Sequence, residues 1–117
     1  MIFQEQPQLI VGDQDVQLLA HANELWNFRW EDVIRIEAYK KDMFSVDLVC
    51  LDFFVKSSDL SYRTHEDMKG FPDLRDRMQR HFSSIKNDWW QQVTRPPFAG
   101  NHTILYEQNK GSSLTQK

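Results

Sequence analysis

The feature that most constrains the fold is one continuous stretch, residues 30–55, whose pattern predicts two β-strands joined by a charged turn. In the first half, Ile34, Ile36 and Ala38 fall on one face, which is typical of a strand with one face on the core and the other in water. Residues 46–55 are mostly apolar on both faces, which is typical of a central strand covered on each side. Residues 40–45 are the expected loop. The stretch therefore predicts a pair of neighbouring strands in a sheet.

A second apolar pattern predicts one main helix. Its stripe recurs every three or four residues, at Phe71, Leu74, Met78, Phe82 and Ile85. Pro72 suits the first helical position, where its missing N–H is not needed. We therefore expect an α+β domain in which this helix covers one face of an antiparallel sheet of about five strands.

The remaining predicted elements are short. Residues 8–11 and 60–64 predict strands, and residues 103–106 predict a last strand or extended arm. Residues 16–26 fit either a helix or two strands joined by a turn. We favour strands, because Trp26, Phe28 and Trp30 alternate onto one face.

The second half of the chain completes the expected domain. Residues 89–93 either extend the main helix or begin a second one, and residues 89–106 are expected to wrap over an edge or the second face of the sheet. The length of 117 residues predicts a single domain over residues 1–107, followed by a polar tail at residues 108–117.

Charge and cysteine content argue against several classes of function. The net charge of −3 makes general nucleic-acid binding a poor expectation, because such binding depends on neutralising phosphates. The sequence has no apolar run of membrane-spanning length and no basic leader, so we expect no membrane association. The single cysteine, Cys50, forms no disulfide framework, which favours a reducing, cytoplasmic compartment.

The sequence carries no strong catalytic or metal-binding motif. Its four histidines are scattered singly, without the paired spacing of a zinc site. Cys50 lies in an apolar strand, where formation of a thiolate is disfavoured. We therefore expect no metal, no cofactor and no catalytic residue, and so no enzyme.

The carboxylates of Asp47 and Asp52 are the main alternative to that expectation. Both lie within the apolar strand, on opposite faces, and a buried carboxylate needs either a partner or a raised pKa. With His65, these aspartates predict a pocket of a small enzyme or of a small-ligand-binding protein. We favour structural pairing instead, with Arg35 or Lys40 as the partner.

The tryptophan-rich segment is the strongest candidate for binding a partner. Trp89 and Trp90 point about 100° apart on a helix, so both are not expected to face one core. Arg95 and Phe98 follow them, and exposed aromatic rings beside arginine are typical of interaction hot spots. Alternatively, residues 96–98 fold over the rings as a lid, which the small size of the domain favours.

We accordingly predict a non-catalytic protein-interaction domain. A supporting basic surface comes from the main helix at Arg75, Arg77 and Arg80. The expected partner is another protein or a second copy of the chain, and sheet-edge pairing is one route to a homodimer.

Several segments resemble known families. They are Trp30-x-Asp32-Val33-x-x-Ile36, Cys50-Leu51-Asp52-Phe53, Gly70-Phe71 and Pro96-Pro97-Phe98-Ala99-x-Asn101-x-Thr103-x-Leu105-Tyr106. Together, over residues 25–107, they resemble a group of small bacterial proteins of unknown function, which implies no established activity. The first segment also resembles bacterial PH-like domains, which implies a helix packed on a curved antiparallel sheet; the Pro96-Pro97 segment departs from that pattern. Some immunity proteins of bacterial toxin systems are similarly small and acidic, which by analogy implies a toxin as partner.

Overall fold

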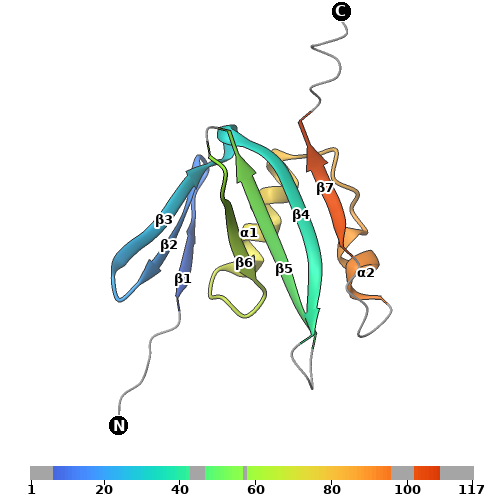
Figure 1. The fold of residues 1–117 in the computed structure, drawn as a ribbon, viewed down its shortest axis with the longest axis horizontal. Helices are drawn as coiled ribbons and strands as arrows, with labels where there is room; N and C mark the ends of the chain where they lie inside the picture. The colour runs from blue at the N-terminus through green and yellow to red at the C-terminus, as the bar shows by residue number, and fades with distance from the viewer. Residues whose placement is uncertain (1–6, 43–46, 57, 96–101, 109–117) are drawn as a thin grey trace, which may run out of the picture.

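Seven strands form two antiparallel sheets in the computed structural model, which describes residues 7–42, 47–56, 58–95 and 102–108 (Figure 1). The first sheet has the order β1-β2-β3, from β1 (Gln8–Val11), β2 (Asp15–Ala20) and β3 (Asn23–Arg29). The second has the order β6-β5-β4-β7, from β4 (Val33–Asp42), β5 (Asp47–Val55), β6 (Ser61–His65) and β7 (Thr103–Glu107). The remaining elements are the 3-10 turn η1 (Trp30–Asp32) and the helices α1 (Phe71–His81) and α2 (Trp89–Thr94). The predicted α+β class is confirmed, with seven strands in two sheets in place of about five in one.

The N-terminal sheet confirms the strand interpretation of residues 16–26. β2 and β3 form a hairpin whose connection is only His21 and Ala22, both with positive φ (53° and 66°). Two such residues form the turn whose twist matches that of an antiparallel pair. The alternation predicted for Trp26, Phe28 and Trp30 directs these rings inward, and Phe28 and Trp30 are buried.

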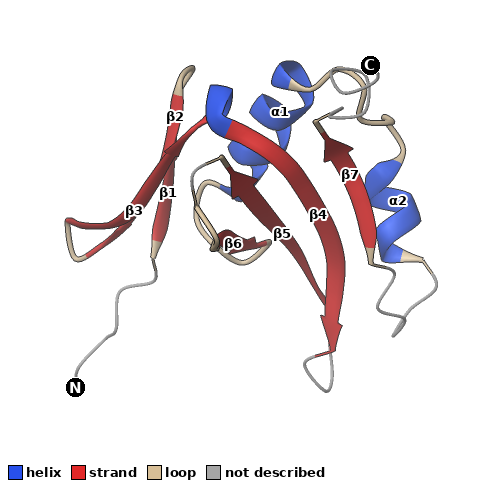
Figure 2. Ribbon diagram, turned by 45° about the horizontal axis from the view of Figure 1, so that its top comes forward, coloured by secondary structure: helices blue, strands red, loops and turns tan. Residues whose placement is uncertain are grey.

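The turn η1 explains why the strands form two sheets. Trp30 is buried, its indole N–H donates to the carbonyl oxygen of Gly12 (3.1 Å), and its backbone N–H donates to that of Gln14 (3.0 Å). The chain therefore turns away from the first sheet at this residue, and β4 begins a new one (Figure 2). The expected continuous strand over residues 30–39 is wrong in its first three residues for this reason.

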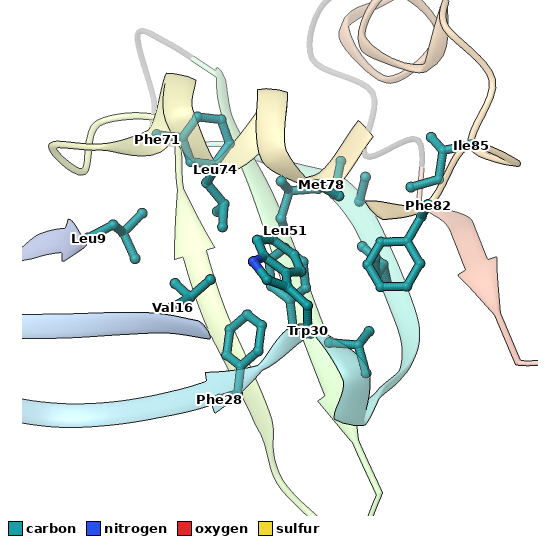
Figure 3. Packing of buried hydrophobic residues seen from close by; sticks show 14 of the residues in the cluster. Leu9, Val16, Phe28, Trp30, Leu51, Phe71, Leu74, Met78, Phe82 and Ile85 are labelled. Atoms are coloured by element: carbon teal, nitrogen blue, oxygen red, sulfur yellow. The ribbon is translucent and has the colours of Figure 1, made fainter. Parts of the chain in front are cut away.

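The hydrophobic core lies between the two sheets and α1. Figure 3 shows Phe71, Leu74 and Met78 of α1 facing Leu51 of β5 and Trp30 of η1. The helix ends at His81, four residues before the predicted end of the apolar stripe. Phe82 and Ile85 are nevertheless buried, because a turn that links their backbones (3.0 Å) keeps both on the core. The predicted stripe is therefore confirmed even where the helix is shorter.

The chain after α1 closes one edge of the second sheet. α2 is a separate short helix, and β7 pairs with β4 as the edge strand. Lys40, on the same face of β4 as the buried Ile36 and Ala38, donates from Nζ to the carbonyl oxygen of Thr94 (3.0 Å). α2 thus lies on the core face rather than on an edge or the second face, and the expected edge position is confirmed for β7.

Some predictions fall outside the described residues. These concern part of the loop at residues 40–45, the lid at residues 96–98 and all but Gln108 of the predicted tail. In the described part, β4 extends to Asp42. No helix described by the structure combines the length and the apolar character needed to cross a membrane.

Candidate functional site

The adjacent tryptophans of α2 have different environments. Trp89 is buried against the core, whereas Trp90 is only partly buried. Their rings meet edge to face, with centres 5.5 Å apart. This agrees with the angular separation expected of neighbours on a helix. Trp90 therefore presents part of an indole at the surface, on a helix fixed by the buried Trp89 and Val93.

Arg75 of α1 lies over the exposed indole. Its guanidinium carbon is 3.7 Å from the centre of the Trp90 ring and 5.7 Å from that of Trp89. This stacking is a cation–π interaction, worth about 0.5–1 kcal/mol at an exposed site and more where water is displaced. Burial lowers the pKa of Arg75 from its ordinary value, and the charge of Glu66 opposes that shift. The guanidinium is therefore partly desolvated.

A hollow of about 290 Å³ opens beside this stacked pair. Its lining consists of Pro72, Arg75, Asp76, Gln79, Asn87, Trp89 and Trp90. We call it the Arg75–Trp90 hollow. It combines a fixed cation, an aromatic face and several polar groups, which is the composition of a protein-interaction hot spot.

The structure separates the other predicted basic residues from this hollow. Arg77 forms an ion pair with Asp13 in the β1–β2 turn, and Arg80 pairs with Asp76 one turn earlier on α1 (3.0 Å). Arg95, just after α2, is exposed, and Phe98 lies outside the described residues. Of the predicted partner-binding residues that are described, Arg75, Trp89 and Trp90 come together.

The residues of the alternative pocket do not share one cavity. Asp47 pairs with Lys40 (3.5 Å) on the core face of the sheet, as the predicted partner suggested. Asp52 lies on the opposite face, and its partner is Arg63 of β6 rather than Arg35. The ring of His65 accepts the backbone N–H of Asp67 (3.2 Å). A depression of about 480 Å³ is lined by Asp52 but by neither Asp47 nor His65.

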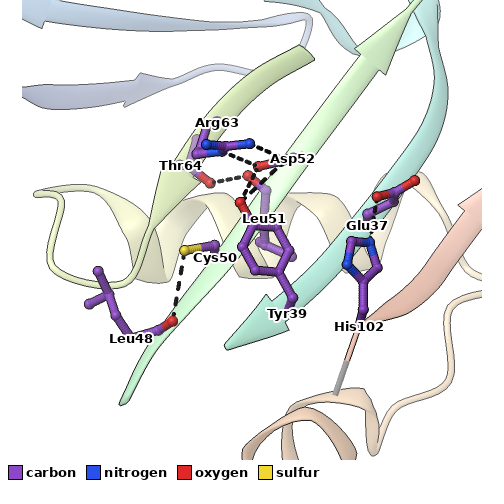
Figure 4. Close-up of polar contacts among 9 residues, drawn as sticks. All are labelled: Glu37, Tyr39, Leu48, Cys50, Leu51, Asp52, Arg63, Thr64 and His102. Carbon is purple, nitrogen blue, oxygen red and sulfur yellow. Dashed lines mark hydrogen bonds and ion pairs between the residues drawn. The ribbon is translucent and has the colours of Figure 1, made fainter. Parts of the chain in front are cut away.

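A polar network covers the outer face of the second sheet (Figure 4). Arg63 donates to both oxygens of Asp52 (3.1 and 3.2 Å), and the hydroxyl of Tyr39 donates to the same carboxylate (3.2 Å). Nε2 of His102 donates to Glu37 (2.6 Å), and the His102 ring stacks on Tyr39 with centres 5.2 Å apart. The network joins β4, β5, β6 and the residue just before β7, and it explains how the second face of β5 is covered without an apolar layer.

The sequence analysis missed most of this network. The alternation of β4 indicates that Glu37 and Tyr39 share a face. Arg63 lies in β6 and His102 just before β7, and the sequence pattern does not specify how these strands pair. No signal in the sequence links Glu37 to His102, which is 65 residues away.

Two nucleophile-type groups in this network are held protonated. Burial raises the pKa of Tyr39 above its ordinary value, and the nearby charge of Asp52 raises it further. Burial also raises the pKa of the Cys50 thiol. Because the thiolate and not the thiol is nucleophilic, this environment disfavours nucleophilic chemistry at Cys50.

The part of the chain that the structure describes holds no cluster of side chains arranged to bind a metal ion. No three His, Cys, Asp or Glu side chains in residues 7–42, 47–56, 58–95 and 102–108 are grouped to hold an ion. The acidic side chains of the outer face are instead occupied by arginine, histidine and tyrosine partners.

The resemblances noted in the sequence stay predictions, because comparison with known proteins identified no relative of this chain. No protein-family model, no curated protein and no solved structure matches the chain.

Proposed function

We propose that this protein is a non-catalytic interaction domain that binds a protein partner through the Arg75–Trp90 hollow. The observation that carries the proposal is the stacking of a partly desolvated arginine on a partly exposed indole. Tryptophan and arginine are the residues most enriched where alanine substitution abolishes binding.

The two side chains are already arranged for binding before a partner arrives. Trp90 belongs to a helix whose other tryptophan is buried, and its ring also packs near Phe71, with centres 6.4 Å apart. Arg75 is restrained by its stack on that ring. Ordering a flexible side chain costs about 0.5–1.5 kcal/mol on association, so prior restraint favours affinity.

The nature of the partner follows the earlier expectations. A different protein, a second copy of this chain, or a toxin in an immunity pair would each bury the hollow. The alternative of a small enzyme or ligand-binding protein draws on the depression beside Asp52, whose carboxylate already has three donors from Arg63 and Tyr39. We prefer the Arg75–Trp90 hollow, because the donors of Arg75 have fewer hydrogen-bond partners than the carboxylate of Asp52.

The test is an interaction measurement with matched variants. Site-specific photo-crosslinking from Asn87, at the rim of the hollow, captures the partner in cells of the native host. Trp90→Ala and Arg75→Ala should each reduce capture at least about tenfold. Arg29→Ala removes an exposed arginine that pairs with Glu31 elsewhere on the surface, and it should leave capture unchanged.

Circular dichroism establishes that each variant remains folded, and sedimentation of the purified chain separates a second copy from a different partner. Equal capture by the wild type, Trp90→Ala and Arg75→Ala would remove the hollow from the interaction and overturn the proposal.

A further inference from the structure

The three arginines of α1 differ in one respect. Arg77 and Arg80 each have a carboxylate partner, Asp13 and Asp76 respectively. Arg75 has no ion pair or hydrogen bond with any residue in the described part of the chain, although it is the one stacked on Trp90. The cation that is partly desolvated against Trp90 is thus the one whose donors are left open.

The stack defines where those donors point. The guanidinium carbon lies over the indole ring, and a guanidinium carries its N–H groups around the rim of its plane, so donors on the rim remain accessible beside the ring. A carboxylate matches that planar fork with two parallel hydrogen bonds. Partial burial strengthens such a pair relative to one in open water.

No side chain that lines the hollow binds the N–H donors of Arg75, so a group from another molecule can occupy that position. Asp76, the acidic residue of the lining, is paired with Arg80. The amide nitrogen of Gln79 donates to the carbonyl oxygen of Ile85 (2.7 Å). The volume of about 290 Å³ accommodates one inserted side chain.

Resting on the proposed function, we infer that the hollow receives an aspartate or glutamate side chain of the partner protein. The carboxylate forms a two-pronged pair with Arg75, and an apolar neighbour in the same segment covers the open part of Trp90. A carboxylate fits better than a doubly charged phosphate, because Arg75 is the single cation of the lining and Asp76 lies beside it.

The experiment uses random twelve-residue peptides displayed on phage and selected on the immobilised full chain. Selected peptides are synthesised and titrated against the wild type, Trp90→Ala, Arg75→Gln and Arg75→Lys by calorimetry. Arg29→Ala serves as the control for loss of a surface arginine. Thermal unfolding confirms that each variant is folded at the temperature of the titration.

The expected result is a shared acidic position in peptides whose binding is lost with Trp90→Ala. Replacing that acid by its amide should weaken binding to the wild type about tenfold or more, and should change little with Arg75→Gln, because the two groups act as one pair. Arg75→Lys should recover only part of the affinity, because an ammonium lacks the planar fork.

Two other outcomes distinguish failure of the carboxylate inference from failure of the proposed function. Peptides that depend on Trp90, but show no coupling between Arg75 and an acidic residue, overturn the carboxylate inference and leave the proposed function standing. If no selected peptide depends on Trp90, both the inference and the proposed function are overturned.

Discussion

Glu37 of β4 and Asp52 of β5 lie directly opposite each other across the second sheet, and both are almost fully buried, at 8% and 5% exposed. Like charges placed opposite each other destabilise a strand pair. The structure offsets this by giving each carboxylate its own arginine, Arg35 for Glu37 and Arg63 for Asp52. The outer face of the sheet is therefore stabilised by one charge pair within β4 and one between β5 and β6.

Removal of the Arg63 side chain should lower the free energy of unfolding by about 2 kcal/mol, since hydrogen bonds to a charged group contribute about 1.5–3 kcal/mol. Arg63→Ala leaves the buried carboxylate of Asp52 opposite Glu37 with Tyr39 as its donor. Urea denaturation followed by tryptophan fluorescence measures the loss. Asp52→Asn added to Arg63→Ala should restore part of it, because the unpaired charge is then gone.

The control for that measurement is Arg80→Ala. Arg80 forms an exposed pair with Asp76 on α1, and such pairs contribute about 0.5 kcal/mol or less. Equal losses for Arg63→Ala and Arg80→Ala would show that the Arg63–Asp52 pair contributes no more than a surface pair.

The raised pKa of Tyr39 predicts a dependence of stability on alkaline pH. Burial, and then the charge of Asp52, disfavour its deprotonated form in the folded state. The unfolded chain therefore releases this proton at a lower pH than the folded one. The resulting contribution to stability is fully present below about pH 10, the ordinary tyrosine pKa, and is lost as the pH rises beyond it.

Tyrosinate absorbance tests this directly. At about pH 10.5, just above the ordinary tyrosine pKa, the folded wild type and Tyr39→Phe should show equal tyrosinate signals, because the Tyr39 hydroxyl stays protonated in the folded state. The unfolding free energy of the wild type should also fall more steeply above pH 10 than that of the variant. An excess tyrosinate signal in the folded wild type would contradict the raised pKa.

The local elements were predictable because their signals lie within a few residues. The alternation of Trp26, Phe28 and Trp30 predicted β3, and the stripe from Phe71 with Pro72 predicted the start of α1. These patterns report which side of a strand or helix meets the core. The α+β class follows from them directly.

The division into two sheets was not predictable in the same way. It depends on the contact between Trp30 and Gly12, which are 18 residues apart, and on the pairing of β7 with β4 across most of the chain. Neither contact leaves a periodic pattern in the sequence. The single sheet expected from the sequence was wrong for this reason.

The candidate site was partly predictable. The stacking of Arg75 on Trp90 needs α1 and α2 to meet, which is a tertiary contact. The predicted basic surface placed Arg77 beside Arg75, but helical geometry sets residues two positions apart about 200° from each other, on different faces. That signal was present in the sequence, and it would have removed Arg77 from the predicted surface.

Gly70 should tolerate no side chain. Its φ is +92°, and a β-carbon there would lie 2.3 Å from the carbonyl oxygen of Leu9. The close approach arises because the backbone N–H of Leu9 donates to the carbonyl oxygen of Lys69 (2.8 Å), which ties β1 to the start of α1. Gly70→Ala should lower the free energy of unfolding by about 2–4 kcal/mol, through backbone strain and loss of this contact.

Gly12→Ala is the matched control. A β-carbon at Gly12 would meet the Asp15 side chain at 3.3 Å, a contact that a small movement relieves. Its cost should be below about 1 kcal/mol. Comparable losses in the free energy of unfolding for the two variants, measured by urea denaturation, would show that the close contact with Leu9 does not determine the cost at Gly70.

The β2–β3 turn offers a stabilising substitution. Ala22 has a φ of 66° in a two-residue connection that requires positive φ at both positions. The left-handed conformation costs a residue with a β-carbon about 1 kcal/mol, and glycine removes that cost. Glycine also gives the unfolded chain more freedom, which offsets part of the gain. Ala22→Gly should therefore raise the free energy of unfolding by about 0.5 kcal/mol.

Ala20→Gly, in the same hairpin, should change the free energy of unfolding in the opposite direction. Ala20 ends β2 and pairs with Asn23, and its φ is not positive, so glycine there gains nothing in the folded state. It should lower the free energy of unfolding by about 0.5–1 kcal/mol. Thermal and urea unfolding of the two variants thus test the sign of the effect. A loss of stability in both would mean that strain at Ala22 is too small to outweigh the freedom that glycine adds to the unfolded chain.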